Sequence, residues 1–169
     1  MIVLGYTHNH KGEGFRRRAG RELIRLGQIH HTFRRVTHTE MLLDGTWDRA
    51  DIASASLMDG GVRIRQDVRL NPAHWIAIDV PTWDARQSAA WFFQHLGEPY
   101  DTRGAIGSVL YGFGSSAGWF CNEACGASVG QIDPQTMPPA GFIALALRQP
   151  GARIVTAEFF STTRTGTAA

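Results

Sequence analysis

Cys121 and Cys125 lie four residues apart, directly after Trp119-Phe120, in a segment of small residues. The small residues favour a helix that begins at Cys121. A thiol in the first turn of a helix lies at the positive end of the helix dipole, which stabilises the thiolate and lowers the thiol pKa. With a base within hydrogen-bonding distance, Cys121 would be a nucleophile. Cys125 falls one turn later, so we expect it to be a small buried residue. The position alone leaves open whether Cys121 is catalytic or part of the core.

The chain has seven histidines that could serve as the base. His38 differs from the others because it lies within a strand-like segment, VTHTEML, where alternation places it on one face with Glu40. Two polar groups on an otherwise apolar face need partners if they are buried, which is typical of a functional site. The alternative is a core histidine with satisfied hydrogen bonds. The pair His30-His31 has no obvious third ligand, so we expect neither a metal site nor a cofactor.

Alternation and turn residues predict the elements that would hold these side chains. Strands are expected at Met1–Tyr6, Val36–Leu43, Ile52–Leu57, Val62–Arg69, Trp75–Val80 and Arg153–Phe159. Helices are expected at Arg16–Leu26, Thr82–Leu96 and Cys121–Val129, and Phe142–Leu147 is an apolar segment. In the second helix, Thr82 is the expected cap, and Ala85, Ala89, Phe92, Phe93 and Leu96 form the expected buried side. This order predicts an α+β fold with a mainly antiparallel sheet packed against helices.

Length and composition restrict the class of protein. A chain of 169 residues with 43% hydrophobic and 19% charged residues suits a single folded domain, which we place at residues 1–160 with a flexible tail at 161–169. Two cysteines cannot form a disulfide framework. Apolar runs fall short of the roughly 18 residues of a membrane helix. In the first residues the charges follow the apolar stretch, which is the reverse of a signal peptide.

The charge is distributed unevenly along the chain. Residues 1–35 hold eight Lys or Arg against two acidic residues, and the remainder holds nine against thirteen. Arg16-Arg17-Arg18 could contact phosphate groups or an anionic surface. No interleaved aromatic residues and no nucleic-acid motif accompany this basic start, so we do not expect a nucleic-acid partner.

Residues 96–121, LGEPYDTRGAIGSVLYGFGSSAGWFC, resemble the nucleophile region of the NlpC-type papain-like cysteine hydrolases. The matching positions are Gly97, Pro99, Tyr100, Gly104, Phe120 and Cys121. In the ordinary branch of that superfamily the catalytic histidine follows the cysteine, whereas no histidine follows Cys121 here. The chain therefore resembles the circularly permuted branch, which includes the YiiX/YaeF-like proteins and is related to lecithin:retinol acyltransferases. The motifs of that branch appear in order as His38-Thr39-Glu40, Gly61-Val62-Arg63, Trp75–Val80, Tyr100-Asp101 and Phe120-Cys121-Asn122-Glu123.

The resemblance implies a permuted papain-like fold and a role for each matching residue. Cys121 would be the nucleophile and His38 the base. The third group, which orients the imidazole and is often Glu in the family, falls at Ser54. Because serine cannot offset the imidazolium charge, either Ser54 only orients His38 or Glu40 takes part. Tyr100 and Glu40 are the residues expected near the oxyanion or the substrate, with the Tyr100 hydroxyl as the hydrogen-bond donor. Asp101 and Glu123 are expected to hold the loop and the helix start together.

The implied reaction is hydrolysis or transfer of an acyl group through a thioester on Cys121. The bond would be an amide, such as a peptide bond of peptidoglycan, or a lipid ester. The resemblance is closest to relatives encoded by phages and prophages, so we expect a cytoplasmic or virion-associated protein. The alternative is a non-catalytic phage virion or assembly component that retains the fold, which the serine at position 54 favours.

Overall fold

The computed structural model describes residues 1–7, 22, 24–26, 28, 30, 32–110, 118–131 and 133–161. Most of the helix expected at Arg16–Leu26 and nearly all of the tail expected at 161–169 lie outside the described residues. None of the described helices has the length and apolar character needed to cross a membrane.

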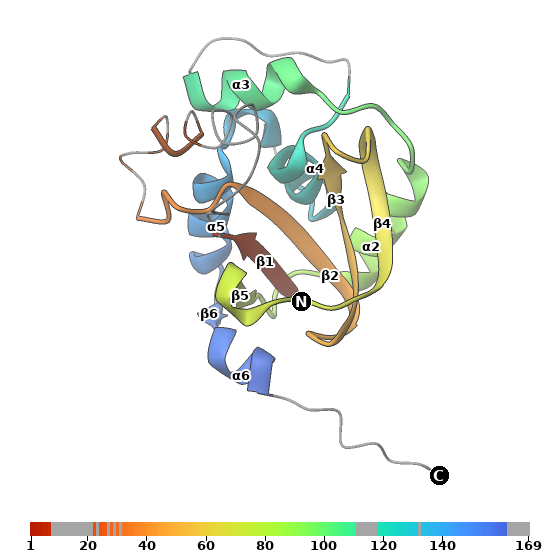
Figure 1. Ribbon diagram of the computed structural model, residues 1–169, viewed down its shortest axis with the longest axis vertical. Helices are drawn as coiled ribbons and strands as arrows, with labels where there is room; N and C mark the ends of the chain where they lie inside the picture. Colours follow the sequence, from red (N-terminus) through yellow and green to blue (C-terminus); the bar gives the residue numbers. More distant parts are fainter. Residues whose placement is uncertain are drawn as a thin grey trace.

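Six strands form one antiparallel sheet, which confirms the expected sheet type (Figure 1). They are β1 (Ile2–Tyr6), β2 (His38–Thr46), β3 (Arg49–Ser56), β4 (Gly61–Val68), β5 (Trp75–Asp79) and β6 (Arg153–Ile154). Their order is β4-β3-β2-β1-β5-β6, so β1 lies between β2 and β5. The predicted bounds of the first five strands agree with the observed bounds to within three residues. β2 pairs with β1 over its first half and with β3 over its second half, and the β1 pairing fixes the directions of the His38 and Glu40 side chains.

Helices pack on both faces of the sheet. They are α2 (Ala85–Gln94), α3 (Thr102–Leu110), α4 (Cys121–Ser128), α5 (Pro139–Leu147) and α6 (Thr156–Ser161), with short 3₁₀ helices η1 (Pro72–His74) and η2 (Pro134–Thr136). α4 packs against β2 and β3, α2 packs against α4, and α5 packs against β1. α6 packs against β5. The α+β class is thus confirmed, with the helix that begins at Cys121 lying against the centre of the sheet.

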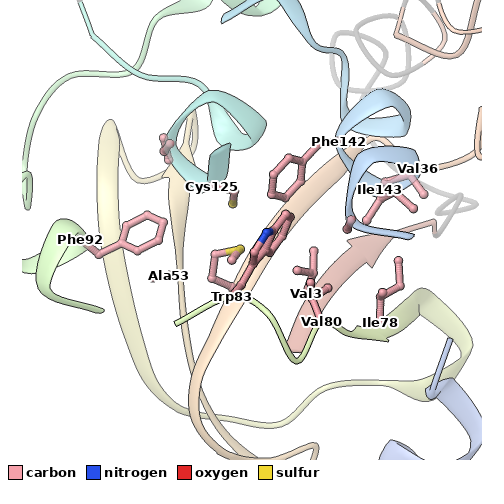
Figure 2. Packing of buried hydrophobic residues seen from close by; sticks show 14 of the residues in the cluster. Val3, Val36, Ala53, Ile78, Val80, Trp83, Phe92, Cys125, Phe142 and Ile143 are labelled. Atoms are coloured by element: carbon pink, nitrogen blue, oxygen red, sulfur yellow. The ribbon is translucent and has the colours of Figure 1, made fainter. Parts of the chain in front are cut away.

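The larger core cluster lies between the sheet and α2, α4 and α5 (Figure 2). Figure 2 shows Cys125 pointing from α4 into this cluster, near the stacked rings of Trp83 and Phe142. Cys125 is 0% exposed, and its thiol donates to the carbonyl oxygen of Thr39 at 3.6 Å. The expectation that Cys125 is a buried packing residue is confirmed, and this contact attaches α4 to β2 beside His38.

Two expectations about α2 are wrong. Its N-cap is Asp84 rather than Thr82, and the Asp84 carboxylate accepts hydrogen bonds from the backbone N–H groups of Arg86 and Gln87. Phe93 and Leu96 are 65% and 56% exposed, and Phe92 is the buried aromatic residue of the helix. A carboxylate binds the free N–H groups of the first turn more strongly than a hydroxyl does, so Asp84 determines where the helix begins.

Replacement of Asp84 by alanine is expected to lower the free energy of unfolding by about 1 kcal/mol, because two N–H groups of α2 lose their acceptor. Urea denaturation at neutral pH measures this loss. Thr82→Ala is the matched control and should change the free energy of unfolding by less than about 0.5 kcal/mol. Equal losses in the two variants would contradict the assignment of the cap.

The strand expected at Arg153–Phe159 is also mostly wrong. Only Arg153 and Ile154 pair with β5, and the chain then turns into α6. Phe159 and Phe160 pack against a second apolar cluster on the opposite face of the sheet from α4, together with Trp47. The helical turn brings both aromatic rings onto this face, which a strand would not do because its side chains alternate.

Candidate active site

Cys121 is the first residue of α4, as expected. The Glu123 carboxylate accepts a hydrogen bond from the backbone N–H of Phe120 at 3.3 Å, which occupies one of the free donors at this helix end. The Cys121 side chain is 5% exposed and lies at the positive end of the α4 dipole. The local sequence thus places a sheltered thiol where a negative charge is stabilised.

His38 begins β2 and pairs with Tyr6 of β1. Its Nε2 lies 2.9 Å from Oε1 of Glu40, and the side chains of His38 and Glu40 are 25% and 4% exposed. Residues two apart on a strand project from the same face, which is why the spacing of these two residues brings them together. The imidazole therefore has a buried carboxylate on one side.

Cys121 is close enough to the imidazole for the two groups to shift each other's pKa, and its thiol also donates to Oδ1 of Asn122 at 3.5 Å. Burial disfavours the imidazolium, but the interactions with Cys121 and Glu40 outweigh it and raise the pKa of His38 to about 10. Burial likewise disfavours the thiolate, but the charge and hydrogen bond of His38 and the backbone hydrogen bonds of Thr39 and Asn122 lower the pKa of Cys121. The two groups favour a thiolate–imidazolium pair.

Arg63 of β4 holds the Glu40 carboxylate through both of its terminal nitrogens. NH1 donates to Oε2 at 2.7 Å and NH2 donates to Oε1 at 2.5 Å, a two-pronged contact. Burial disfavours the carboxylate, but the hydrogen bonds and charges of His38 and Arg63 lower the pKa of Glu40 to about 2. Glu40 is therefore a carboxylate with a cationic partner on each side.

Ser54 is brought into the same region but makes a different contact. Its hydroxyl donates to the carbonyl oxygen of Thr39 at 2.7 Å, and the side chain is completely buried. The His38 ring contacts Glu40 in this structure, and not Ser54, which the resemblance gives as the third group of the site. The hydroxyl of Ser54 thus stabilises the pairing of β3 with β2 next to the histidine.

Tyr100 lies beside Cys121 because its segment pairs with two others. The Tyr100 N–H donates to the Gly60 carbonyl at 3.0 Å, and Tyr100 also forms a parallel bridge with Trp119. Gly118 permits this close approach, since a Cβ at that position would run into the Pro99 carbonyl. Burial and the nearby charge of Cys121 raise the pKa of Tyr100, so its hydroxyl stays protonated and able to donate.

Asp101 and Glu123 hold local structure, as expected. The Asp101 carboxylate accepts from the Gly104 N–H at 2.8 Å near the start of α3. Burial raises the pKa of Glu123 to about 7, opposed by its hydrogen bond from Phe120. Both carboxyl groups therefore support the backbone around Cys121.

The contrast between the two cysteines separates their roles. Burial raises the pKa of Cys125 although Thr39 donates to its sulfur, and no cation opposes this effect. The pKa of Cys121 moves in the opposite direction because His38 adjoins it. Only Cys121 has the environment of a reactive thiol.

Arg63 is the main site residue to which the sequence did not assign a role. The pattern Gly61-Val62-Arg63 identifies it only as part of a motif. An arginine that alternates with apolar residues in a strand indicates a charged group that needs an acidic partner. The sequence does not identify that partner, because it depends on the register of two strand pairs. Among the described residues, no group of three or more His, Cys, Asp or Glu side chains could hold a metal ion.

Comparisons of the chain with protein-family models, with curated proteins and with solved structures find no significant match.

Proposed function

We propose that the protein is a cysteine hydrolase or acyltransferase of the permuted papain-like type, acting on an amide or ester bond. The observation that carries this proposal is the clustering of Cys121, His38 and Glu40, in which His38 contacts Glu40 and interacts with Cys121 at the start of α4. In chain order the histidine strand precedes the cysteine helix. That order supports the permuted branch of the papain-like hydrolases, in which the histidine also precedes the cysteine.

In the proposed reaction the Cys121 thiolate attacks the carbonyl carbon and forms a carbon–sulfur bond. The backbone N–H of Cys121 and the hydroxyl of Tyr100 are suited to stabilise the oxyanion. Collapse of the intermediate breaks the bond to the leaving nitrogen or oxygen, which takes its proton from His38. Water or an acceptor alcohol or amine then gives a proton to His38 and attacks the thioester, which releases the acyl group and restores the thiolate.

Each charged group has a defined part in this sequence. His38 has a pKa of about 10, so it carries a proton for the leaving group while Cys121 is a thiolate. Glu40 has a pKa of about 2 and remains a carboxylate throughout, so it orients the ring and offsets the imidazolium charge. Glu40 thus supplies the charge that Ser54 cannot supply.

Covalent labelling tests the proposal without knowledge of the natural substrate. An acyl electrophile, such as an aryl thioester carrying a dipeptide, should acylate the wild-type protein at a single position, Cys121. Cys121→Ser should lose at least about 99% of the labelling, because a serine in this position lacks a stabilised anion. Cys125→Ser is the matched control and should be labelled like the wild type. Intact-protein and peptide mass spectrometry locate the adduct.

Substrate panels then define the reaction class. Muropeptides, acyl amides and phospholipids are incubated with the wild-type and Cys121→Ser proteins, with peptidoglycan peptides as the first class to test. Product release that depends on Cys121 supports the proposal. Labelling that persists in Cys121→Ser, or a wild-type protein that neither retains the acyl group nor cleaves the probe, would refute it.

A non-catalytic role as a phage virion or assembly component is the second candidate. The observation that favours it is the low exposure of Cys121, whose side chain is 5% exposed. Under this alternative the thiol is a packing residue like Cys125, and small electrophiles react with neither cysteine until the protein unfolds. Equal, slow alkylation of both cysteines would therefore favour the alternative.

A further inference from the structure

Arg63 connects the site to a second carboxylate outside it. Its NH1 and NH2 bind Glu40, and its Nε donates to Oδ2 of Asp59 at 3.1 Å. Asp59 also accepts from Arg65 at 2.6 Å. The Arg63 side chain is 12% exposed, whereas Asp59 lies at the surface, so the network runs from the buried Glu40 to solvent. All three donor groups of the guanidinium are engaged, which leaves it a single orientation.

The sheet register explains how an arginine of β4 contacts a glutamate of β2. Ser54 pairs with Arg63, so both project from the same face of the sheet. Met41 pairs with Ala53, which puts Glu40 level with Ser54 on that face. Arg63 therefore has to reach across β3, a span of two strand spacings or about 10 Å, above the position of Ser54. The small side chain of Ser54 leaves room for this crossing.

We propose that Arg63 is a positioning residue of the active site, which fixes the Glu40 carboxylate against His38 and offsets its charge. The inference rests on the proposed function, because it assigns Arg63 to the Cys121–His38–Glu40 site. Arg63 makes no described contact with Cys121, and it acts on the thiol by holding Glu40 and through its own positive charge. With a neutral residue at this position, no guanidinium would offset the negative charge of Glu40. That charge would then act in full on the imidazole and on the thiolate.

The proposal predicts the direction in which Cys121 reactivity shifts with pH. The titratable and charged groups around Cys121 are His38 and Glu40 of β2, Arg63 of β4, Tyr100 and Asp101 of the adjoining segment, and Cys125 and Glu123 of α4. Removal of the Arg63 cation leaves the others in place and makes the local potential more negative. Thiolate formation is then less favourable, so the pH midpoint of reactivity rises.

The experiment measures the rate of alkylation of Cys121 by iodoacetamide from pH 3 to 10, using peptide mass spectrometry. The midpoint for Arg63→Gln should lie about one pH unit above that of the wild type, the effect of one lost charge several ångströms away at an intermediate dielectric. Arg49→Gln is the matched control, because Arg49 pairs with the exposed Asp67 and not with the site. Its midpoint should remain within about 0.3 pH units of the wild-type value.

Arg63→Lys separates charge from geometry. Lysine keeps the positive charge, so the midpoint should remain near the wild-type value. It cannot reproduce the two-pronged contact, so acyl transfer from the thioester probe should slow by about tenfold at the optimal pH. A role limited to stability would instead lower the melting temperature of both variants without moving the midpoint of Arg63→Gln, and that result would overturn the proposal.

A second comparison applies if Arg63→Gln does not fold. Glu40→Gln and the double variant Glu40→Gln/Arg63→Gln contain no unpaired buried carboxylate, and the double variant has a pair of amides that can bond to each other. The midpoint should be higher in the double variant than in Glu40→Gln, and equal midpoints would overturn the proposal.

The wild-type profile distinguishes failure of this inference from failure of the proposed function. A wild-type midpoint at the ordinary thiol value of 9.0 would refute the function itself. A low wild-type midpoint that Arg63→Gln leaves unchanged would refute only the role of Arg63.

Discussion

His38→Ala should reduce the rate of acylation of Cys121 at pH 7 by about 10²- to 10⁴-fold, the range typical of a lost general acid–base group. The variant lacks both the hydrogen bond and the positive charge that lower the pKa of Cys121. Burial then dominates and returns the group to the neutral thiol, which is a poor nucleophile. Stopped-flow measurement of thioester cleavage gives the rate, and mass spectrometry confirms the position of the adduct.

The matched control for this prediction is His30→Ala, since His30 is exposed. It should react at the wild-type rate. His38→Ala should also recover part of its reactivity as the pH is raised, because hydroxide then generates the thiolate without the imidazolium. A His38→Ala variant with wild-type reactivity at pH 7 would show that the histidine does not activate Cys121.

The strands around the site were predictable because each has alternating or continuous apolar residues bounded by turn residues. Asp59-Gly60 precedes β4 and Pro81 follows β5, and both observed ends agree with these signals. Helix ends were less predictable. Thr82 and Asp84 are both acceptable caps in sequence, and the choice depends on which side chain reaches free N–H groups in three dimensions.

The positions of His38, Glu40 and Cys121 were predictable because each depends on a short segment of sequence. His38 and Glu40 share a face of one strand, and Cys121 begins a helix of small residues. The Arg63–Glu40 contact was not predictable, because it depends on two strand registers and on a small residue at position 54 between them. Ser54 was assigned by position alone, and the sequence could not show that its hydroxyl would bind the Thr39 carbonyl.

The proposed ion pair also predicts how stability depends on pH. The raised pKa of His38 contributes stability that is fully present below its ordinary value of 6.5 and is lost as the pH rises toward about 10. The lowered pKa of Cys121 contributes stability that is fully present above its ordinary value of 9.0 and is lost as the pH falls. Where these two pH ranges overlap, the folded protein binds one extra proton on His38 and one fewer on Cys121, so the two effects cancel.

Cys121→Ser removes this cancellation. In the variant His38 loses the contributions of Cys121, the largest of those that raise its pKa, and only Glu40 opposes burial, so this pKa falls below its wild-type value of about 10. The contribution of the pair in the wild type is constant where its two effects cancel. The free energy of unfolding of the wild type minus that of the variant should therefore increase with pH as long as His38 of the variant keeps its proton, and level off where His38 loses it.

Urea denaturation of both proteins at pH 5.5, 7.0 and 8.5 measures this difference. Comparison of the two proteins is necessary because Glu123, with a pKa of about 7, titrates in both and its contribution cancels. Cys125→Ser is the control: the raised pKa of Cys125 keeps that thiol neutral in both states at these pH values, so its effect should not change with pH. A constant difference for Cys121→Ser as well would mean that Glu40 alone does not keep His38 protonated, because only a change in bound protons couples stability to pH.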